Sequence, residues 1–392
     1  MGQPGRDAAA DPLLAQSDDG RIVMAGDDVA AAGSVAALVG PGTVEVQRYP
    51  LPEPGPGEAL LEVLQANVCG SDVGIYHHRN PVLRDVVLGH EFVARVGVLG
   101  AGLTHDSAGT PVSVGDRVVV VYFRVCGHCR PCGRGEFNMC VNWADTMAAP
   151  PTRAPHFHGG FASHYHLAAG RHFYVVPDVL DDAEVAGANC GLAQMLFTVE
   201  RIGVRRGQTV VVQGCGGLGL YACAVAARSG ARVIAVERDP ARIAAALRFG
   251  ATEVVDMATD PTPAGRQDRI GRLTDGDGAD LVVEVTGRPD AFAEAVAFVR
   301  TGGAIASVGN LNVGPGSALS IAPALFTRKN LTVRGFLRYD PWYLRRALDF
   351  LVDTRDLHPY GAMSDRVYSL DEIGAAVART ETGGVLRAAV VP

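Results

Sequence analysis

Short apolar runs alternate with helical stretches along the second half of the chain. The predicted strands are rich in Val, Ile, Leu or Ala. They lie near Val210, Val233 and Glu253 and over 281–285, 304–308 and 331–335. Two predicted helices, 240–249 and 289–299, lie between these strands. Strands that alternate with helices indicate an α/β fold with a parallel, doubly wound sheet.

The first half of the chain has a different pattern, with several strand-like segments. Residues 1–33 are rich in Ala, Asp and Gly without a sustained period, and we expect a disordered extension there. Residues 35–47 are expected to form a hairpin that turns at 40–42. Further strands are predicted at 58–64, 114–121, 159–167 and 385–391, and further helices at 192–202, 342–353 and 371–379.

A glycine-rich turn joins the first strand and the first helix of the alternating half. Gly214, Gly216 and Gly219 have the spacing G-x-G-x-x-G, and Gly217 and Leu218 lie within it. Between a strand and a helix, such glycines allow a tight turn, close approach of a pyrophosphate, and close packing of helix on strand. The helix N-terminus adds free N–H groups for the phosphates. The sequence therefore predicts a dinucleotide-binding Rossmann site.

The residue that ends the second strand of this unit indicates which dinucleotide is bound. Glu237 lies eighteen residues after Gly219, where a carboxylate accepts hydrogen bonds from ribose hydroxyls and repels a 2′-phosphate. Arg238 opposes this interpretation, because an arginine beside the ribose can bind that phosphate. Arg242, one helical turn later, is expected near the adenosine. We expect NAD in preference to NADP.

Four cysteines within about 124–142 form the most specific metal motif of the chain. They are Cys126, Cys129, Cys132 and Cys140. Four thiolates at this spacing can close a tetrahedral zinc site. An iron–sulfur cluster is the nearest alternative, but ferredoxin runs place three residues before the last cysteine, where this chain has seven. Disulfides are the other alternative.

Composition excludes several classes of protein. Of 392 residues, 48% are hydrophobic, so full cores can be buried, and the length suggests two or three domains. A net charge of −7 without a long basic run argues against nucleic-acid binding. No apolar run is long enough to span a membrane, and no signal peptide is recognised. Cysteines with metal-site spacing suit a reducing compartment, so we expect a cytoplasmic protein.

These motifs together resemble the zinc-dependent medium-chain alcohol/polyol dehydrogenase family, from about Ser34 to the end of the chain. The resemblance also rests on Cys69-x-Ser71-Asp72, Gly89-His90-Glu91, the segment 159–162 and Cys190. It implies a GroES-like catalytic domain at 34–191 and 339–392, with a structural zinc lobe at 124–142. It implies a Rossmann domain at 192–338 and an active site in the cleft between the two domains.

The resemblance assigns a catalytic zinc to Cys69, His90 and Cys190, with one position open for the substrate oxygen. A buried structural cysteine is the alternative for Cys190. Zinc is expected to polarise the substrate oxygen, Ser71 to relay its proton, and a hydride to pass between an alcohol/carbonyl pair and the nicotinamide. With the four-cysteine lobe, this gives two zinc ions per chain.

Four further residues receive roles from the same resemblance. Asp72 matches an acid that orients the ligand histidine, and Glu91 matches a glutamate that approaches the metal during ligand exchange. Arg387 matches an arginine that reaches the cofactor pyrophosphate, with a surface arginine as the alternative. Val308 is also expected at the cofactor.

The chain departs from the family at Gly74, where many relatives carry a histidine that passes the proton to solvent. His77 and His78 lie in the same stretch, but we expect them to be surface residues. Trp143 and Phe157 are candidates for lining the substrate cleft.

Three functions fit this sequence. The first is an oxidoreductase for an alcohol/carbonyl pair, and the second is a biosynthetic reductase that reduces a conjugated or other double bond. The third is a non-catalytic NAD-binding protein, which the intact Cys69, Ser71, His90 and Cys190 argue against. The family implies a small-molecule alcohol or carbonyl substrate and a homodimer or homotetramer, often joined at an edge strand of the Rossmann sheet.

Overall fold

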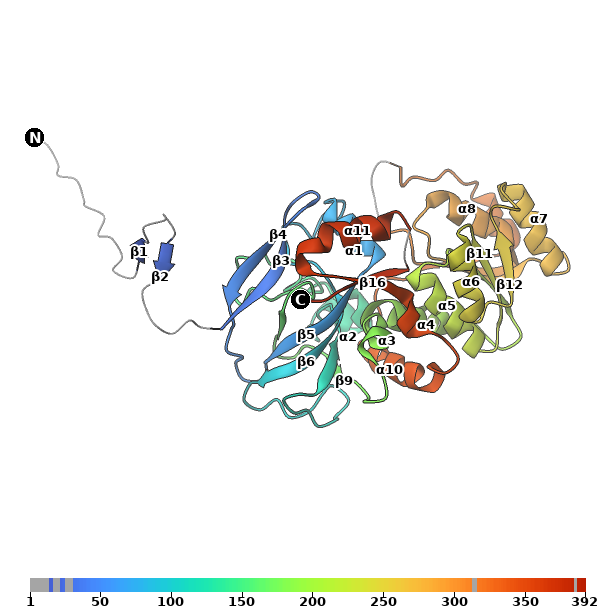
Figure 1. Cartoon of the computed structure of the whole chain (residues 1–392). Coiled ribbons are helices and arrows are strands. Elements are labelled where there is room, and N and C mark those ends of the chain that lie inside the picture. The colour runs from blue at the N-terminus through green and yellow to red at the C-terminus, as the bar shows by residue number, and fades with distance from the viewer. Residues whose placement is uncertain (1–13, 17–21, 25–30, 312–315, 384–385) are drawn as a thin grey trace, which may run out of the picture.

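The computed structural model describes residues 14–16, 22–24, 31–311, 316–383 and 386–392. Its two large sheets lie in two neighbouring domains, and the last elements of the chain return to the first domain (Figure 1). We call them the β-rich domain and the Rossmann domain. The α/β fold class predicted from the alternating pattern is confirmed.

The Rossmann domain contains a six-stranded sheet in the order β12-β11-β10-β13-β14-β15, with every neighbouring pair parallel. All six strands were predicted to within a few residues. Their bounds are β10 (Thr209–Gln213), β11 (Arg232–Glu237), β12 (Glu253–Asp256), β13 (Ala279–Glu284), β14 (Val299–Ser307) and β15 (Thr332–Gly335). Because all six strands run in the same direction, the glycine turn and Glu237 both lie at the carboxyl ends of the strands.

Helices cover both faces of this sheet. The helices are α4 (Ala193–Ile202), α5 (Gly217–Arg228), α6 (Pro240–Arg248), α7 (Pro263–Leu273), α8 (Pro289–Phe298), α9 (Ala324–Lys329) and α10 (Tyr343–Thr354). Val210 and Val212 of β10 pack in the core that includes α4, α5 and α10, whereas Val211 packs in the core that includes α7 and α8. Burial on both faces explains why the strands are apolar without alternation.

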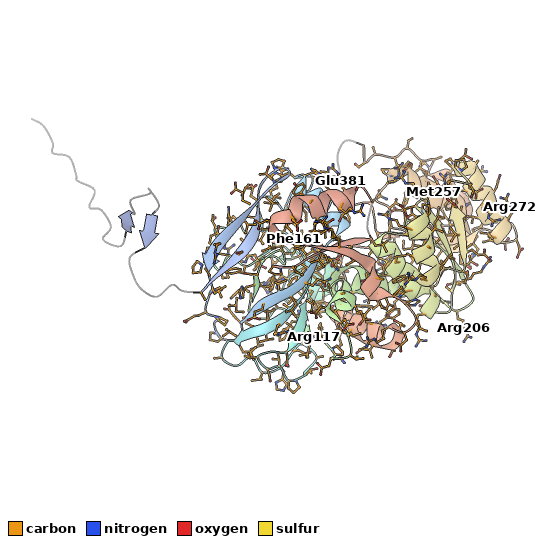
Figure 2. The ribbon with its side chains drawn as sticks, in the orientation of Figure 1. Arg117, Phe161, Arg206, Met257, Arg272 and Glu381 are labelled. Atoms are coloured by element: carbon orange, nitrogen blue, oxygen red, sulfur yellow. The ribbon has the colours of Figure 1, made fainter. Side chains whose placement is uncertain are left out.

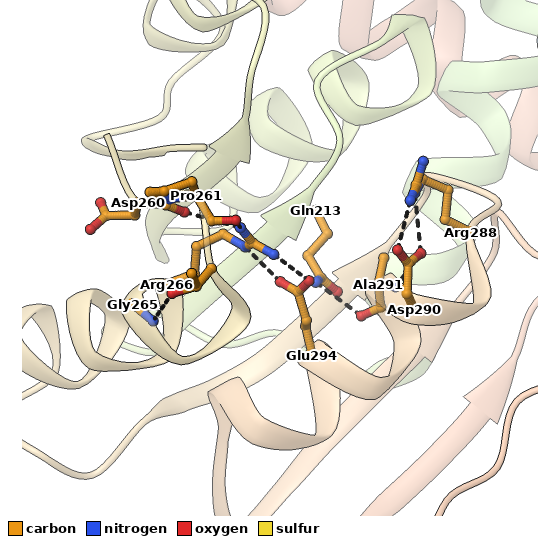
Figure 3. Close-up of polar contacts among 10 residues, drawn as sticks. Gln213, Asp260, Pro261, Gly265, Arg266, Arg288, Asp290, Ala291 and Glu294 are labelled. Atoms are coloured by element: carbon orange, nitrogen blue, oxygen red, sulfur yellow. Dashed lines mark hydrogen bonds and ion pairs between the residues drawn. The ribbon is translucent and has the colours of Figure 1, made fainter. Parts of the chain in front are cut away.

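Helix α7 was not predicted, because its sequence is polar and only its Ile270 is a large buried apolar residue. Ion pairing holds it instead. Arg266 of α7 donates to Glu294 of α8 through Nε and Nη2, at 2.8 and 2.5 Å (Figure 3). Gln213, at the end of β10, donates to the carbonyl of Ala291 at 3.0 Å, so α8 is also fixed to the sheet.

The β-rich domain contains a seven-stranded sheet in the order β16-β17-β5-β6-β7-β9, with β8 paired to β5. The bounds are β5 (Ala59–Val68), β6 (Glu91–Leu99), β7 (Arg117–Val120), β8 (His164–Leu167), β9 (Phe173–Val175), β16 (Ser364–Tyr368) and β17 (Arg387–Val390). Strand β17 pairs antiparallel with β5, so this domain combines segments from both sides of the Rossmann domain. The exact boundaries at 191/192 and 338/339 stay predictions.

The predicted N-terminal hairpin is confirmed as β3 (Ala32–Gly40) and β4 (Thr43–Pro50). Strands β1 (Leu14–Gln16) and β2 (Ile22–Met24) also pair, which differs from the expectation of disorder over 1–33. The other residues before Ala31 lie outside the described part of the chain. Strands β6, β9 and β16 and the short helix α1 (Gly70–Tyr76) were not predicted.

One apolar core crosses the boundary between the two domains. It runs from Val119 and Phe123 of the β-rich domain to Val210 and Leu220 of the Rossmann domain. A second core lies wholly within the β-rich domain and includes Phe161, which Figure 2 labels there. Among the described residues, no helix has both the length and the apolar character needed to cross a membrane.

Candidate active site

The glycine turn leaves the N-terminus of α5 open for a ligand. Gly214 has a φ of +88°, and a Cβ on Gly219 would lie 1.8 Å from the carbonyl oxygen of Gly214. Both positions therefore require glycine. At Gly216, the N-cap residue of α5, a Cβ would meet nothing within 4 Å, and no side chain caps the helix. Free N–H groups beside open space are what a pyrophosphate requires.

Glu237 is fixed against this turn. Its Oε2 accepts a hydrogen bond from the N–H of Cys215 at 2.8 Å, and its Oε1 accepts from those of Arg238 and Asp239 at 2.7 and 3.2 Å. A carboxylate has about four acceptor positions, so these three donors leave room for about one more. The Arg238 side chain is exposed, whereas Arg242 donates from Nη2 to the carbonyl of Gly383 at 3.3 Å.

The structure brings together donor atoms from three distant segments of the β-rich domain. One ligand atom each from Cys69, His90, Glu91 and Cys190 lies within 4.8 Å of the other three. The Sγ atoms of Cys69 and Cys190 are 4.0 Å apart. Two thiolates on one tetrahedral zinc, each at a Zn–S distance of about 2.3 Å, would be about 3.8 Å apart. The donor set and its spacing therefore fit a zinc ion.

One carboxylate positions two of these ligands. Asp72 is fully buried, and its Oδ2 accepts a hydrogen bond at 2.8 Å from the N–H of Cys69. Cys69 is the N-cap residue of helix α1, so this bond caps the start of the helix. Its Oδ1 is 3.1 Å from Nδ1 of His90. With Nδ1–H donating to Asp72, the lone pair of Nε2 faces the cluster, which is the tautomer a metal needs.

Cys190 lies on a π-helical turn (Ala188–Leu192) that leads into α4. The neighbouring Asn189 is fully buried, and its Nδ2 donates to the carbonyls of His90 and Val120 at 2.9 and 3.0 Å. The hydroxyl of Tyr339 donates to the carbonyl of Asn189. These bonds hold Cys190 beside His90. Asn189 was not predicted as a functional residue, although an amide within the apolar run before Cys190 was an available signal.

Burial and contact set the protonation of the ligands. The S–H···S contact with Cys190 lowers the pKa of Cys69 well below its ordinary value, and the same contact raises the pKa of Cys190. Burial disfavours protonated His90, but the charge and hydrogen bond of Asp72 outweigh it and raise the pKa of His90. One thiolate is thus available before a metal binds.

Glu91 connects the cluster to the glycine turn through an arginine. Burial raises the pKa of Glu91 to about 8, and the charge of Arg387 opposes this rise. Arg387 is buried, and its Nη1 donates to Oε2 of Glu91, whereas Oε1 of Glu91 has no hydrogen-bond partner. A Cβ on Gly217 would lie 2.8 Å from Nε of Arg387. The alternative of a surface arginine is therefore wrong.

Ser71 lies at the same cluster, with its Oγ 3.4 Å from Nε2 of His90. His77 and His78 were both predicted as surface residues. The side chain of His77 is 33% exposed, and its Nε2 is 3.2 Å from a carboxylate oxygen of Glu381 at the end of α11 (Ile373–Glu381; Figure 2). The side chain of His78 differs from the prediction, because only 15% of it is exposed and its Nε2 is buried, 3.6 Å from a carboxylate oxygen of Asp85. Val308 follows β14 at the same sheet edge as the glycine turn, and its N–H donates to the carbonyl of Glu284 at 3.0 Å.

The four-cysteine lobe forms a second cluster. The Sγ atoms of Cys126, Cys129, Cys132 and Cys140 all lie within 4.8 Å of one another, and those of Cys129 and Cys140 are 4.0 Å apart. A hydrogen bond from the backbone of His128 lowers the pKa of Cys126 to about 5, whereas burial raises the pKa of Cys132 to about 12. Four sulfur donors in one compact group fit a closed zinc site.

Aromatic residues beside the first cluster were only partly predicted. The ring of Tyr122 lies 5.0 Å from that of His90, and Tyr122 was not identified from the sequence. Trp143 packs against both large cores and lies under the guanidinium of Arg338. The prediction for Phe157 was wrong, because this side chain is fully buried against Val35 and does not line a site.

Two family models match the chain. Residues 55–178 match the alcohol dehydrogenase GroES-like domain, and residues 217–353 match the zinc-binding dehydrogenase domain. The first match covers Cys69, His90 and the four-cysteine lobe. The second begins within the glycine turn and covers the rest of the parallel sheet.

Complete proteins match over most of their length. The chain is 32% identical to the 5-exo-hydroxycamphor dehydrogenase of Pseudomonas putida, over 90% of this chain and 96% of that protein. The structure resembles an alcohol dehydrogenase from Thermotoga maritima, with a TM-score of 0.85 and 25% identity over 92% of this chain and 100% of that one. It also resembles a putative zinc-binding dehydrogenase from Sinorhizobium meliloti, solved bound to NADP, with a TM-score of 0.78 and 27% identity over 92% and 100% of the two chains. With the two domains, the glycine turn and the cysteine clusters, these matches establish that the chain belongs to the zinc-dependent medium-chain alcohol dehydrogenase family.

Proposed function

We propose that the protein interconverts a small-molecule alcohol and its carbonyl compound, with NAD as the hydride carrier and one zinc ion in each cysteine cluster. The observation that carries this proposal is the convergence of Cys69, His90 and Cys190 with Ser71 beside them. Three protein ligands and a nearby hydroxyl are typical of a catalytic zinc that retains an open position. The four-cysteine lobe offers no such opening.

The residues of the chain have separate tasks in this reaction. A bound zinc ion supplies Lewis acidity, which makes the substrate oxygen a better acid in one direction and its carbonyl a better electrophile in the other. Ser71 takes or returns the proton of the substrate oxygen. Asp72 keeps Nε2 of His90 free for the metal. Glu91 has an oxygen without a partner in this cluster, which supports the role in ligand exchange.

The cofactor is positioned by the glycine turn and by Arg387. Open space at Gly216 and the free N-terminus of α5 favour a pyrophosphate there. Arg387 lies against Gly217 while it pairs with Glu91, so its charge is close to both the pyrophosphate position and the metal cluster. Val308, at the same sheet edge, is proposed to border the cofactor.

The direct test is a screen of zinc-loaded protein with NAD against primary and secondary alcohols and polyols, and with NADH against carbonyl compounds. Absorbance at the NADH band reports turnover in both directions. We expect turnover with at least one alcohol/carbonyl pair. A protein that reduces conjugated double bonds but no carbonyl group would instead support the second hypothesis, a biosynthetic reductase.

NAD is proposed over NADP because the charge of Glu237 is fixed where the ribose would bind. Three backbone N–H groups hold this carboxylate against the glycine turn, so it cannot swing away from a 2′-phosphate. Arg238 is exposed and available on the other side, and the related structure from Sinorhizobium meliloti contains NADP. The balance between Glu237 and Arg238 therefore decides the preference.

Replacing Glu237 with serine is expected to change this preference. A charge-assisted hydrogen bond is worth roughly 1.5–3 kcal/mol, so kcat/KM for NAD should fall by about tenfold to a hundredfold. The value for NADP should rise, because a like-charge repulsion is removed. Both constants are measured with one alcohol. Glu237→Gln is the matched control, since it keeps the size and one acceptor oxygen but removes the charge. An unchanged NAD/NADP ratio in both variants would show that Glu237 does not face the ribose.

The exposed strand β15 supports a homodimer. It is an edge of the Rossmann sheet, all four of its residues are exposed, and Val333 and the nearby Leu337 are exposed apolar side chains. An uncovered strand edge favours pairing with a second copy. Sedimentation equilibrium of the zinc-loaded protein should give a dimer or a tetramer, and a monomer would contradict the proposal. The two reduced-thiol clusters support a cytoplasmic location.

A further inference from the structure

Arg338 is a buried arginine whose environment does not satisfy it. Only 6% of its surface is exposed, and its φ is +57°. Glycine favours this left-handed region, and a long side chain there is strained. The segment around it is held from three sides, since the carbonyl of Leu337 accepts from Asn138, the hydroxyl of Tyr339 donates to Asn189, and Asp340 accepts from Arg201. The neighbouring contacts therefore keep Arg338 in its strained position.

Aromatic rings lie close to the Arg338 guanidinium, but among the described residues no acceptor is hydrogen-bonded to it. Its Cζ lies 4.5 Å from the centroid of the Trp143 ring and 5.7 Å from that of Phe123. Within the described residues, Arg338 donates no hydrogen bond and forms no ion pair, and its buried Nε has no partner. Cation–π contact stabilises the charge across the plane but does not satisfy the N–H groups in the plane. A buried cation with unpaired donors is costly unless a ligand completes it.

Aromatic contacts connect this arginine to the metal cluster. The ring of Phe123, under Arg338, is 5.1 Å from the ring of Tyr122, and Tyr122 is 5.0 Å from the ring of His90. Two aromatic side chains, Phe123 and Tyr122, therefore connect Arg338 to the metal cluster.

We propose that Arg338 recognises a carboxylate on the substrate, so that the preferred substrate is a hydroxy acid or the corresponding oxo acid. This inference rests on the proposed function and specifies its substrate class. A planar guanidinium over the Trp143 ring presents its N–H groups in one plane, and a carboxylate matches that geometry with two parallel hydrogen bonds. In this proposal, the strained backbone at Arg338 is retained because it places the guanidinium N–H groups beside the active site.

A second explanation is that Arg338 only balances the charge of the four-cysteine lobe. Negative charge on Cys140 stabilises the guanidinium, although burial lowers the pKa of Arg338. This explanation predicts an effect on the lobe and none on substrate choice. It also leaves the in-plane N–H groups unexplained, because none of them bonds to a sulfur atom among the described residues. The two explanations are separated by comparing acids with their neutral isosteres.

The experiment uses ω-hydroxy acids from 4-hydroxybutanoate to 6-hydroxyhexanoate and the corresponding ω-hydroxy amides. Acid and amide have the same shape and differ in charge, and the series spans the distance between the two groups. For the wild type, kcat/KM with NAD should favour the acid over the amide at one chain length or more. Arg338→Met should lower this acid/amide ratio by about tenfold to a hundredfold, which is the effect of losing a charge-assisted hydrogen bond. Arg338→Lys keeps the positive charge but loses the planar pair of N–H donors. Its acid/amide ratio should therefore lie between the ratios of the wild type and of Arg338→Met.

Arg366→Met is the matched control. The guanidinium of Arg366 lies 4.6 Å from the centroid of the Tyr368 ring, which resembles the contact of Arg338 with Trp143, but Arg366 is exposed and pairs with Glu372. The acid/amide ratio of this variant should equal that of the wild type. Zinc content and thermal stability are recorded for every variant, because loss of zinc without a change in the ratio would favour charge balance at the lobe.

A binding measurement separates this inference from the proposed function. Isothermal titration of zinc-loaded protein without cofactor gives the dissociation constants of the same acids and amides without turnover. If no substrate turns over but the acid/amide ratio of these constants depends on Arg338, the inference stands and the proposed function falls. If alcohols turn over and neither ratio differs by more than about threefold between the wild type, Arg338→Lys and Arg338→Met, the inference is overturned.

Discussion

Replacing His90 with alanine is expected to reduce kcat/KM by about a thousandfold or more with any alcohol that the wild type oxidises. His90 is one of three proposed protein ligands of the catalytic zinc, and its loss leaves two thiolates that cannot hold the ion in the required geometry. The Lewis acidity of such an ion is worth several kcal/mol in the transition state, and each 1.4 kcal/mol corresponds to a factor of ten in rate. Zinc should fall from two to one per chain, as measured by elemental analysis beside the kinetics.

The fold of the His90→Ala variant should survive. The ring contacts Tyr122 but does not lie in either large apolar core, so circular dichroism and the zinc of the four-cysteine lobe should persist. His105→Ala is a suitable control, because His105 is exposed and lies outside both metal clusters. Activity within tenfold of the wild type, together with two zinc ions per chain, would rule out His90 as a ligand.

Replacing Cys126 with serine should have the opposite effect to His90→Ala. The variant should lose more stability than activity. The four-cysteine lobe at 124–142 exposes apolar residues such as Met139 and Val141, at 48% and 65% of their surface, so it has little core of its own. Structural zinc sites bind with about 10–16 kcal/mol of apparent free energy, part of which stabilises the fold. Losing about a third of this would remove more than ~3 kcal/mol from a native stability of about 5–15 kcal/mol.

Thermal unfolding and zinc content measure this effect. The Cys126→Ser variant should bind one zinc ion, unfold at a clearly lower temperature, and retain activity for as long as it is folded. Cys223→Ala is the matched control, because Cys223 lies in the apolar core and belongs to neither cluster. A variant with unchanged thermal stability would show that the lobe does not depend on its metal. Iron and sulfide in the wild type would show that the cluster is of another kind.

The parallel sheet and the two clusters of possible metal ligands could be predicted from the sequence for different physical reasons. The central strands β10, β11 and β13 are buried on both faces, which produces apolar runs that stand out from the helices between them. The proposed zinc ligands belong to short motifs with specific spacing. His90 and Cys190 are far apart in sequence, yet the structure places them together, and here the resemblance to a known family supplied what spacing alone could not.

Other features depend on tertiary contacts that no local pattern records. Helix α7 is held by the pair of Arg266 with Glu294, and a polar helix of this kind has no apolar stripe to recognise. Asn189 matters because of two carbonyls that lie far away in the sequence. The environment of Arg338 likewise exists only after Phe123 and Trp143 have packed around it, so an isolated arginine in the sequence gave no indication of a site.

The pairing of β17 with β5 has a consequence for synthesis on the ribosome. Strand β5 ends at Val68 and β17 begins at Arg387, so the whole Rossmann domain is translated between the two partners. At about 5–20 residues per second, this interval is on the order of tens of seconds. During it, residues 66–68 of β5 lack the strand that pairs with them in the folded protein, and Glu91 lacks the arginine that neutralises it. The nascent chain therefore presents an open strand edge beside an unfinished metal site, and this is the interval in which chaperones and zinc supply have most influence on yield.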